Sequence, residues 1–167
     1  MVGGLMAKKN KKSKTNTPVF DNRRARHDYF IEDTMEVGIV LEGSEVKSIR
    51  DGSCSLKEGF ITVDLEPHRL TLHQVDIAPY QPAGALNHHP KRTRMLLAKK
   101  KEIEKLARAV DVKGVTLVPL KLYFSGAHAK ILLGLAVGKA KHDKRHAIAE
   151  RDNQREMQRV MSKRMKF

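Results

Sequence analysis

Apolar residues recur with a two-residue period through most of the segment between residues 26 and 138. Residues 29–31 and 37–41 are rich in aromatic and β-branched side chains, which predicts a strand interrupted by a bulge near residues 33–36. Further strands are expected over 60–63 and 70–77. The chain after residue 26 is therefore predominantly β in its pattern.

The last part of this segment predicts a hairpin. Residues 115–124 and 129–137 are two strongly apolar runs on either side of Ser125-Gly126. A tight turn between two such runs places them side by side and antiparallel. We expect this hairpin to form the centre of a sheet.

Two segments have a helical period instead. Residues 43–50 place Val46 and Ile49 three apart behind Ser44, a residue suited to the N-cap, and Asp51-Gly52 ends the helix. Residues 90–113 predict a longer helix that ends at Gly114. Its expected apolar face comprises Leu96, Ile103, Leu106, Ala107 and Val110, flanked by Arg92, Lys99, Lys100, Lys101, Glu102, Lys105 and Arg108.

These elements predict a mainly β fold, a small OB-like antiparallel β-barrel with flanking α-helices. A chain of 167 residues with 40% apolar residues can build one modest core. We expect three parts: a disordered basic N-terminal tail over 1–19, a barrel body over 20–138, and a basic C-terminal tail over 139–167.

Charge is concentrated in the two predicted tails. The formal net charge is +14, of which residues 1–19 contribute +5, residues 20–138 only +3, and residues 139–167 +6. A body that is nearly balanced between two basic ends suggests a polyanionic partner. Aromatic residues make up 5% of the chain, so recognition of RNA shape and backbone is favoured over stacking of many bases.

The sequence offers little catalytic chemistry. We find no phosphate-binding glycine loop, no dinucleotide fingerprint, no serine-nucleophile motif, and no Cys/His spacing suited to zinc. The pair His88-His89 is expected to face solvent as hydrogen-bond donors rather than to hold a metal. We therefore expect a protein without a catalytic residue, metal or cofactor.

Location follows from the cysteine count and the hydropathy pattern. The single cysteine, Cys54, is expected to be a small buried hydrophobe, which suits a reducing compartment. No run approaches the roughly 20 apolar residues that span a bilayer, and the N-terminus lacks the apolar region of a secretory signal. We expect a cytoplasmic protein that does not bind a membrane.

Three basic clusters are candidates for RNA contacts. The first precedes the first long strand, the second lies at the start of the predicted long helix, and the third is the C-terminal tail. Arginine is well suited to phosphate because its planar fork donates two parallel hydrogen bonds. A solvated lysine-rich helix face is the alternative for the second cluster. The first two clusters are Arg23, Arg24, Arg26 and His27, and Lys91, Arg92 and Arg94 followed by Lys99–Lys101.

The tail carries a narrow apolar stripe at helical spacing. Met157, Val160, Met161 and Met165 fall on one side among basic residues. An isolated helix of this length is marginal in water, so we expect the tail to fold when it is laid into an anionic groove. A helix packed back on the barrel through its methionines is the alternative.

Three long motifs resemble one known family, the SsrA-binding proteins, also called small protein B. They are NRRARHDYFIEDTMEVGIVLEGSEVKSIR over 22–50, HPKRTRMLL over 89–97 and GKAKHDKR over 138–145, in family order and spacing. The similarity covers about residues 20–165.

The resemblance implies an OB-like body that binds the tRNA-like domain of transfer-messenger RNA (tmRNA, the SsrA RNA). The pair would enter stalled bacterial ribosomes in trans-translation, with the protein in place of the missing anticodon arm. The tail would occupy the decoding centre and the mRNA channel of the small subunit and contact its ribosomal RNA. The implied partners are tmRNA and the ribosome, and we expect a monomer.

The resemblance also implies roles for particular residues. At the tmRNA-binding face it points to Glu36, Leu96 and Lys130, with Arg92 and Arg94 beside them and the basic residues Arg23, Arg24 and Arg26. At the decoding centre it points to Gly138, Lys139, Lys141, His142, Asp143, Lys144 and Arg145. Arg155, Arg159, Val160 and Met161 match the tail helix, whereas Ala140 and Asn153 depart from the family pattern.

Two other functions remain open on the residues alone. A general basic OB-type protein of single strands or of ribosome structure would carry a similar charge. An RNA-modifying enzyme would need a catalytic group, which the motifs do not supply.

Overall fold

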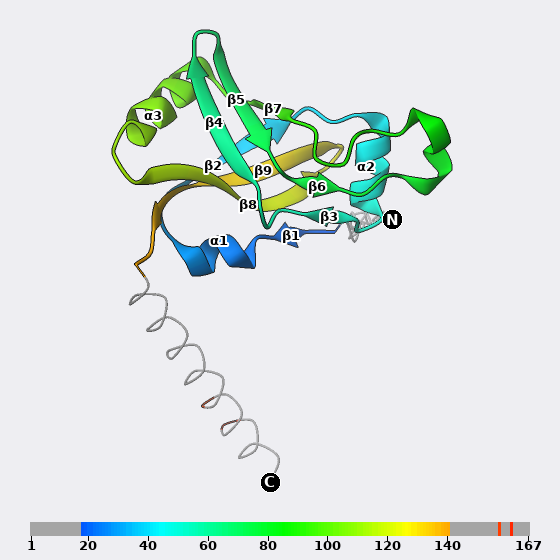
Figure 1. The fold of residues 1–167 in the computed structure, drawn as a ribbon, viewed down its shortest axis with the longest axis horizontal. Helices are drawn as coiled ribbons and strands as arrows, with labels where there is room; N and C mark the ends of the chain where they lie inside the picture. Colours follow the sequence, from blue (N-terminus) through cyan, green and yellow to red (C-terminus); the bar gives the residue numbers. More distant parts are fainter. Residues whose placement is uncertain (1–17, 141–156, 158–160, 162–167) are drawn as a thin grey trace, which may run out of the picture.

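A computed structural model describes residues 18–140 together with Met157 and Met161. In these residues the chain is mainly β: a seven-stranded antiparallel sheet curls back on itself into a small barrel, with three α-helices on its outside (Figure 1). The predicted fold class is confirmed.

The elements follow one another along the chain with short connections. Their bounds are β1 Phe20–Asp21, α1 Arg23–Asp28, β2 Tyr29–Ile39, α2 Gly43–Arg50, β3 Cys54–Ser55, β4 Phe60–Leu65, β5 His68–His73, β6 Asp76–Ile77, a 3-10 turn Gln81–Leu86, β7 Arg94–Leu97, α3 Lys100–Val110, β8 Val115–Ser125 and β9 His128–Gly138.

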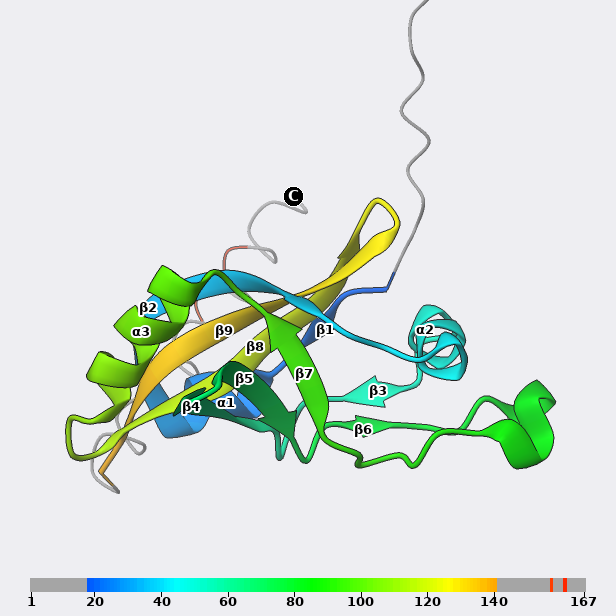
Figure 2. The same ribbon diagram turned by 90° about the horizontal axis from the view of Figure 1, so that it is seen from above.

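The strand order around the sheet is β1-β8-β4-β5-β7-β2-β9, and β9 pairs again with β8, which brings the sheet round to its starting edge. The join between β4 and β8 rests on a single register pair, Ile61 with Leu117. A separate two-stranded ribbon, β3 and β6, extends from the barrel beside α2. Figure 2 shows α3 and α2 at opposite ends of the barrel.

The predicted hairpin of β8 and β9 is confirmed. Its turn follows the pairing of Ser125 with His128, and Gly126 adopts a φ of 62°, a left-handed conformation that favours glycine. The predicted bulge in β2 is also present, between Ile31 and Asp33, one residue earlier than the sequence pattern placed it. The bulge changes which residues of β2 face outward, so that Glu36 is exposed and Val37 is buried.

The helix α2 has the predicted bounds but a different cap. Glu42 is the N-cap residue, and the Glu45 carboxylate accepts a hydrogen bond from the Glu42 backbone N–H at 2.8 Å. The expected cap, Ser44, lies inside the helix and its hydroxyl pairs with His88.

The long helix predicted over 90–113 is shorter than expected. Residues Arg94–Leu97 form β7, and the helix α3 begins only at Lys100 and ends at Val110. In β7 burial alternates residue by residue, with Arg94 and Leu96 inside and Met95 and Leu97 outside, as the pleat of a strand requires. The sequence also gave no sign of α1, a six-residue helix that begins after Asn22.

Two apolar clusters hold these elements together. The larger one fills the barrel and includes Leu70, Leu72, Leu96, Leu117 and Leu133, with Ile103 and Leu106 of α3 packed onto it. The smaller one packs Ala25 of α1 against the outer side of β8 and β9. Cys54 is partly buried at the edge of the larger cluster, and burial raises the pKa of its thiol to about 12.

Candidate RNA-binding surface

Three neighbouring strands bring Glu36, Lys130 and Tyr123 together on the outside of the barrel. Lys130 lies opposite Gly38 of β2 and opposite Tyr123 of β8 in the sheet register. The Lys130 ammonium donates to Glu36 Oε1 at 2.5 Å, and the Tyr123 hydroxyl donates to Glu36 Oε2. Both Glu36 and Lys130 keep a third or more of their side-chain surface in solvent. We call these three residues the Glu36 cluster.

The charge state of the Glu36 cluster is fixed by its own hydrogen bonds. The bond from Lys130, followed by the bond from Tyr123, holds the pKa of the Glu36 carboxyl below its usual range. The Glu36 carboxylate in turn raises the pKa of Tyr123 to about 12. At neutral pH the cluster therefore presents an ionised carboxylate, an ammonium and a neutral phenol, which together can donate to and accept from an RNA.

Leu96 does not lie on this surface, contrary to the sequence prediction. Its side chain is 3% exposed and belongs to the barrel core, whereas its neighbour Leu97 is 56% exposed. Leu97 pairs with Gly38, two residues from Glu36 on the same outward face of β2. A Cβ at Gly38 would lie 3.3 Å from Leu97 Cβ, so glycine lets the leucine lie close to the strand. Leu97 is the leucine that is available for contact.

Arg92 and Arg94 are both held by one carboxylate. Glu45 Oε1 accepts from Arg94 Nε at 2.7 Å and from Arg92 Nε at 2.8 Å, and Arg92 Nη2 reaches Glu45 Oε2 at 2.5 Å. The side chains of Glu45 and Arg94 are 0% exposed, and that of Arg92 is 26% exposed. Arg94 also donates to the carbonyl oxygens of Val75 and Pro90 at 2.7 and 2.9 Å.

Burial alone would raise the pKa of the Glu45 carboxyl. The hydrogen bonds from Arg92, the Glu42 N–H and Arg94 outweigh that desolvation, so the pKa lies below the usual value and the group stays ionised. Arg94, expected to touch RNA, is turned inward and joins α2 to the turn before β7. Its position allows it to orient Arg92 rather than to reach a phosphate itself.

The basic cluster before the first long strand lies on α1. Arg23, Arg24 and Arg26 are all exposed. Arg24 pairs with Asp28 at 3.5 Å, one helical turn on, and Arg26 lies 3.9 Å from Asp21. Exposed pairs at these distances are weak, so both guanidinium groups can exchange their partner for a phosphate.

The first residue of the C-terminal tail is attached to α1. The Lys139 backbone N–H donates to the Asp28 carbonyl at 3.0 Å, and its ammonium donates to the Arg26 carbonyl at 3.1 Å. The same ammonium lies 4.7 Å from the centroid of the exposed Phe30 ring, a cation–π contact. Gly138 ends β9 opposite Tyr29. The tail therefore leaves the barrel from the C-terminal end of α1.

Most of the predicted tail residues lie outside the described part of the chain. They are Lys141, His142, Asp143, Lys144, Arg145, Arg155, Arg159 and Val160. Met161 is described, together with Met157; both are helical, and they are 63% and 64% exposed. Neither of these two methionines is packed on the barrel.

The histidine pair is divided between inside and outside. His88, expected to face solvent, is buried and bonded to the Ser44 hydroxyl at 2.9 Å and to the Ile77 carbonyl at 3.0 Å. His89 is exposed. Within the described residues no three His, Cys, Asp or Glu side chains are grouped as a metal site would need.

Sequence reasoning missed Tyr123 and Leu97 on this surface. The hairpin turn was a usable signal for Tyr123, because a pairing of Ser125 with His128 places Tyr123 opposite Lys130.

None of the helices in the described part of the chain has the length and hydropathy to span a bilayer.

Known proteins resemble this chain over most of its length. It is 47% identical to an SsrA-binding protein of Staphylococcus saprophyticus over 92% of this chain and 98% of that protein. Proteins of the same name from Geobacillus thermodenitrificans and Limosilactobacillus reuteri are also 47% identical, over 89% and 93% of this chain and 95% and 98% of theirs.

A solved structure and a family model agree with these relatives. The fold matches a chain of the structure described as "tmRNA-SmpB: a journey to the center of the bacterial ribosome" with a TM-score of 0.64 and 46% identity, over 79% of this chain and 95% of that one. The model of the SmpB protein family matches residues 19–163, which include the barrel, α1 and all but the last four residues of the tail. The chain belongs to the SmpB protein family.

Proposed function

We propose that this chain binds the tRNA-like domain of tmRNA and brings it to stalled ribosomes in trans-translation. The observation that carries the proposal is the exposed Glu36 cluster in a chain 47% identical to proteins named SsrA-binding protein. The name of the solved relative, which places tmRNA and SmpB at the ribosome, supports the same partners. The chain acts by binding rather than by catalysis.

The tRNA-like domain contacts the Glu36 cluster and the neighbouring Leu97. Glu36 accepts hydrogen bonds from a base edge or a ribose hydroxyl, because a carboxylate offers acceptors only. Lys130 and Arg92 supply positive charge, and the arginines of α1 add to it. Such a mixed surface of acceptor, cation and apolar side chain recognises a folded RNA by shape as well as charge.

The tail makes a separate contact with the ribosome. Gly138 and Lys139 fix where the tail begins, and residues 141–145 reach the decoding centre, where His142 stacks on a ribosomal base and Asp143, Lys144 and Arg145 bind alongside. Beyond them Arg155, Arg159, Val160 and Met161 lie in the mRNA channel as a helix. The exposure of Met157 and Met161 supports a helix whose apolar side is available to another partner.

Two truncations of the full chain test this division of labour. One ends at Ala140 and keeps the Lys139 contacts with α1; the other ends at Gly138 and removes them. Both should bind the isolated tRNA-like domain with nearly full affinity and fail to support tagging on stalled ribosomes. Loss of RNA affinity in the Ala140 truncation would place the tmRNA contact in the tail and overturn the proposal.

A further inference from the structure

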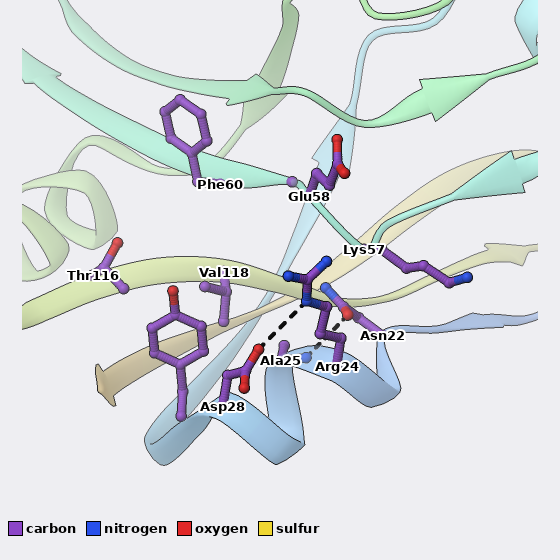
Figure 3. Close-up of a pocket in the computed structure, with 11 residues that line it drawn as sticks. Asn22, Arg24, Ala25, Asp28, Lys57, Glu58, Phe60, Thr116 and Val118 are labelled. Carbon is purple, nitrogen blue, oxygen red and sulfur yellow. Dashed lines mark hydrogen bonds and ion pairs between the residues drawn. The ribbon is translucent and has the colours of Figure 1, made fainter. Parts of the chain in front are cut away.

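A pocket of about 430 Å³ opens between α1 and the start of β4, away from the Glu36 cluster. Figure 3 shows Arg24 rising from α1 into the space below Glu58 and Phe60, with Thr116 and Val118 of β8 at the back. The volume is within the range of sites that enclose small ligands. Of the residues proposed above to contact tmRNA, only Arg24 of α1 lines this pocket.

The walls of the pocket are fixed in place before any ligand arrives. Asn22, which is buried, donates to the Leu56 carbonyl at 2.8 Å and to the Pro119 carbonyl at 2.9 Å, and it accepts from the Ala25 N–H at 3.1 Å. One amide thereby joins α1, the turn before β4 and β8. Because these three segments form the pocket, its shape is set by the fold.

Gly59 holds the turn close to β8. A Cβ at this position would lie 2.7 Å from Val75 Cγ2 and 2.8 Å from Pro119 Cγ, closer than any real side chain allows. The glycine therefore lets Lys57 and Glu58 sit against the strand, at the rim of the pocket.

The pocket has two aromatic rings in its lining, Tyr29 and Phe60. Phe60 is partly exposed and stacks on His73, with ring centroids 4.9 Å apart and an interplanar angle of 12°. The Thr62 hydroxyl lies 2.9 Å from His73 Nε2 and fixes the imidazole. An aromatic ring held from behind in this way is a stacking platform for a flat ligand.

Charged side chains of both signs lie at the boundary between this pocket and a smaller hollow of about 180 Å³. Arg24, Lys57 and Glu58 line both, and Lys91 lines the smaller one. Glu58 is paired with Lys91 at 3.3 Å and Asp28 with Arg24 at 3.5 Å, and the carboxylate of Asp76 also lines the smaller hollow. Within the described part of the chain no ion pair or hydrogen bond engages the Lys57 side chain, so its ammonium is available to an anionic ligand.

We propose that this pocket binds a single unpaired nucleotide of an RNA. The base lies on Phe60 and Tyr29, and its edge meets the Thr116 hydroxyl and the Glu58 carboxylate. The phosphate lies at the boundary with the smaller hollow, beside Arg24 and Lys57. Aromatic rings for the base and cations for the phosphate are the combination by which proteins hold unpaired nucleotides.

The pocket is a second RNA contact, distinct from the Glu36 cluster. Val118 lines the pocket and Tyr123 belongs to the cluster, and they are five residue steps apart along β8, about 17 Å of strand. A single nucleotide cannot reach from one to the other. The inference rests on the proposed function in taking RNA as the partner, and it adds a place where that RNA, or a second one, inserts a base.

Nuclear magnetic resonance of the ¹⁵N-labelled full chain tests the pocket directly. Adenosine 5′-monophosphate and uridine 5′-monophosphate are titrated separately, and inorganic phosphate serves as the control for anion binding. Saturable shifts are expected at the amides of Tyr29, Phe60 and Thr116 with the nucleotides and not with phosphate. Equal shifts with phosphate, or no saturable shift at these amides, would overturn the proposal.

Variants assign the shifts to stacking and to charge. Phe60→Ala should weaken nucleotide binding about fivefold or more, while Leu65→Ala, an exposed apolar residue of the same strand, should leave it unchanged. Lys57→Glu should weaken binding as well, in contrast to Lys113→Glu outside the pocket. Equal effects of Phe60→Ala and Leu65→Ala would overturn the stacking role.

Measuring the affinity of the chain for the tRNA-like domain beside its affinity for the nucleotides separates this inference from the proposed function. Failure of the wild-type chain to bind that RNA would overturn the proposed function. Full RNA affinity together with no nucleotide binding in the pocket would overturn the pocket inference alone.

Discussion

Glu45 and Arg94 form an ion pair whose two side chains are both withdrawn from solvent, with Arg94 Nε 2.7 Å from Glu45 Oε1. The Glu45 carboxylate also accepts a hydrogen bond from the backbone N–H of Glu42, the N-cap residue of α2. Arg94 donates a hydrogen bond to the carbonyl of Pro90 in the turn before β7. The pair therefore links a helix cap to the strand that carries Leu97.

Replacing Glu45 by alanine should lower the free energy of unfolding by about 3–5 kcal/mol, because the buried Arg94 charge would lose its partner. Chemical denaturation measures this loss. Glu58→Ala is the matched control, since Glu58 pairs with Lys91 at 3.3 Å in solvent, where such a pair contributes about 1 kcal/mol at most. Similar losses in the two variants would show that the buried pair contributes no more to the free energy of unfolding than an exposed pair does.

The stability of the chain should fall in acid because of Glu45. Its pKa in the folded chain lies below the ordinary value of 4.5, so its contribution is fully present above pH 4.5 and is lost as the pH falls through the folded pKa. The denaturation midpoint of the wild type should therefore decrease as the pH falls below about 4.5. Arg92→Met removes two hydrogen bonds to Glu45 and brings the folded pKa of that carboxyl closer to the ordinary value, so the acid-induced drop of its midpoint should be smaller and complete at a higher pH. Identical pH profiles would argue against this linkage.

Leu96 and Leu97 should respond in opposite ways to truncation. Leu96→Ala opens a cavity in the barrel and should cost about 2–5 kcal/mol of stability. Leu97→Ala should leave the melting temperature nearly unchanged and weaken binding of the tRNA-like domain about fivefold, or about 1 kcal/mol. Thermal melting and a binding titration of both variants check the assignment. Intact binding in Leu97→Ala would remove this residue from the RNA contact.

The sequence pattern predicted the elements that obey a simple period and missed those set by distant partners. The β8–β9 hairpin was found because Gly126 interrupts two apolar runs. Residues 94–97 were assigned to a helix because Leu96 continues the spacing of the apolar face of α3. The buried Arg94 concealed the alternation of β7, since its partner Glu45 is 49 residues away and no local pattern indicates it.

The proposed RNA-binding surface was predictable only in part, for the same reason. Family motifs pointed to Glu36 and Lys130, which the fold brings into contact across β2 and β9. The sequence prediction chose Leu96 instead of its neighbour Leu97, because a shift of one residue in the strand register decides which of the two side chains faces outward. Neither the contact of Tyr123 with Glu36 nor the pocket at Lys57 follows from local sequence, because both depend on the closure of the barrel.

Tyr123 should remain protonated far above the ordinary tyrosine range. Its hydrogen bond to the Glu36 carboxylate raises the pKa to about 12. The tyrosinate absorbance of the wild type minus that of Tyr123→Phe should therefore rise near pH 12 rather than near pH 10, the ordinary value. In Glu36→Gln the same transition should move back toward pH 10. A difference curve that rises near pH 10 in the wild type would show that the bond is absent in solution.

The central claim is that this barrel recognises a folded tRNA-like RNA through the Glu36 cluster and that the positive charge of the chain is not sufficient for that recognition. It is tested most directly by competition at physiological salt, in which the bound tRNA-like domain of tmRNA is displaced either by the same RNA or by an unstructured RNA of equal length. The unstructured RNA should be needed at about 100-fold higher concentration or more, and Glu36→Ala should reduce that preference. Equal displacement by the two RNAs, unaffected by Glu36→Ala, would contradict the claim.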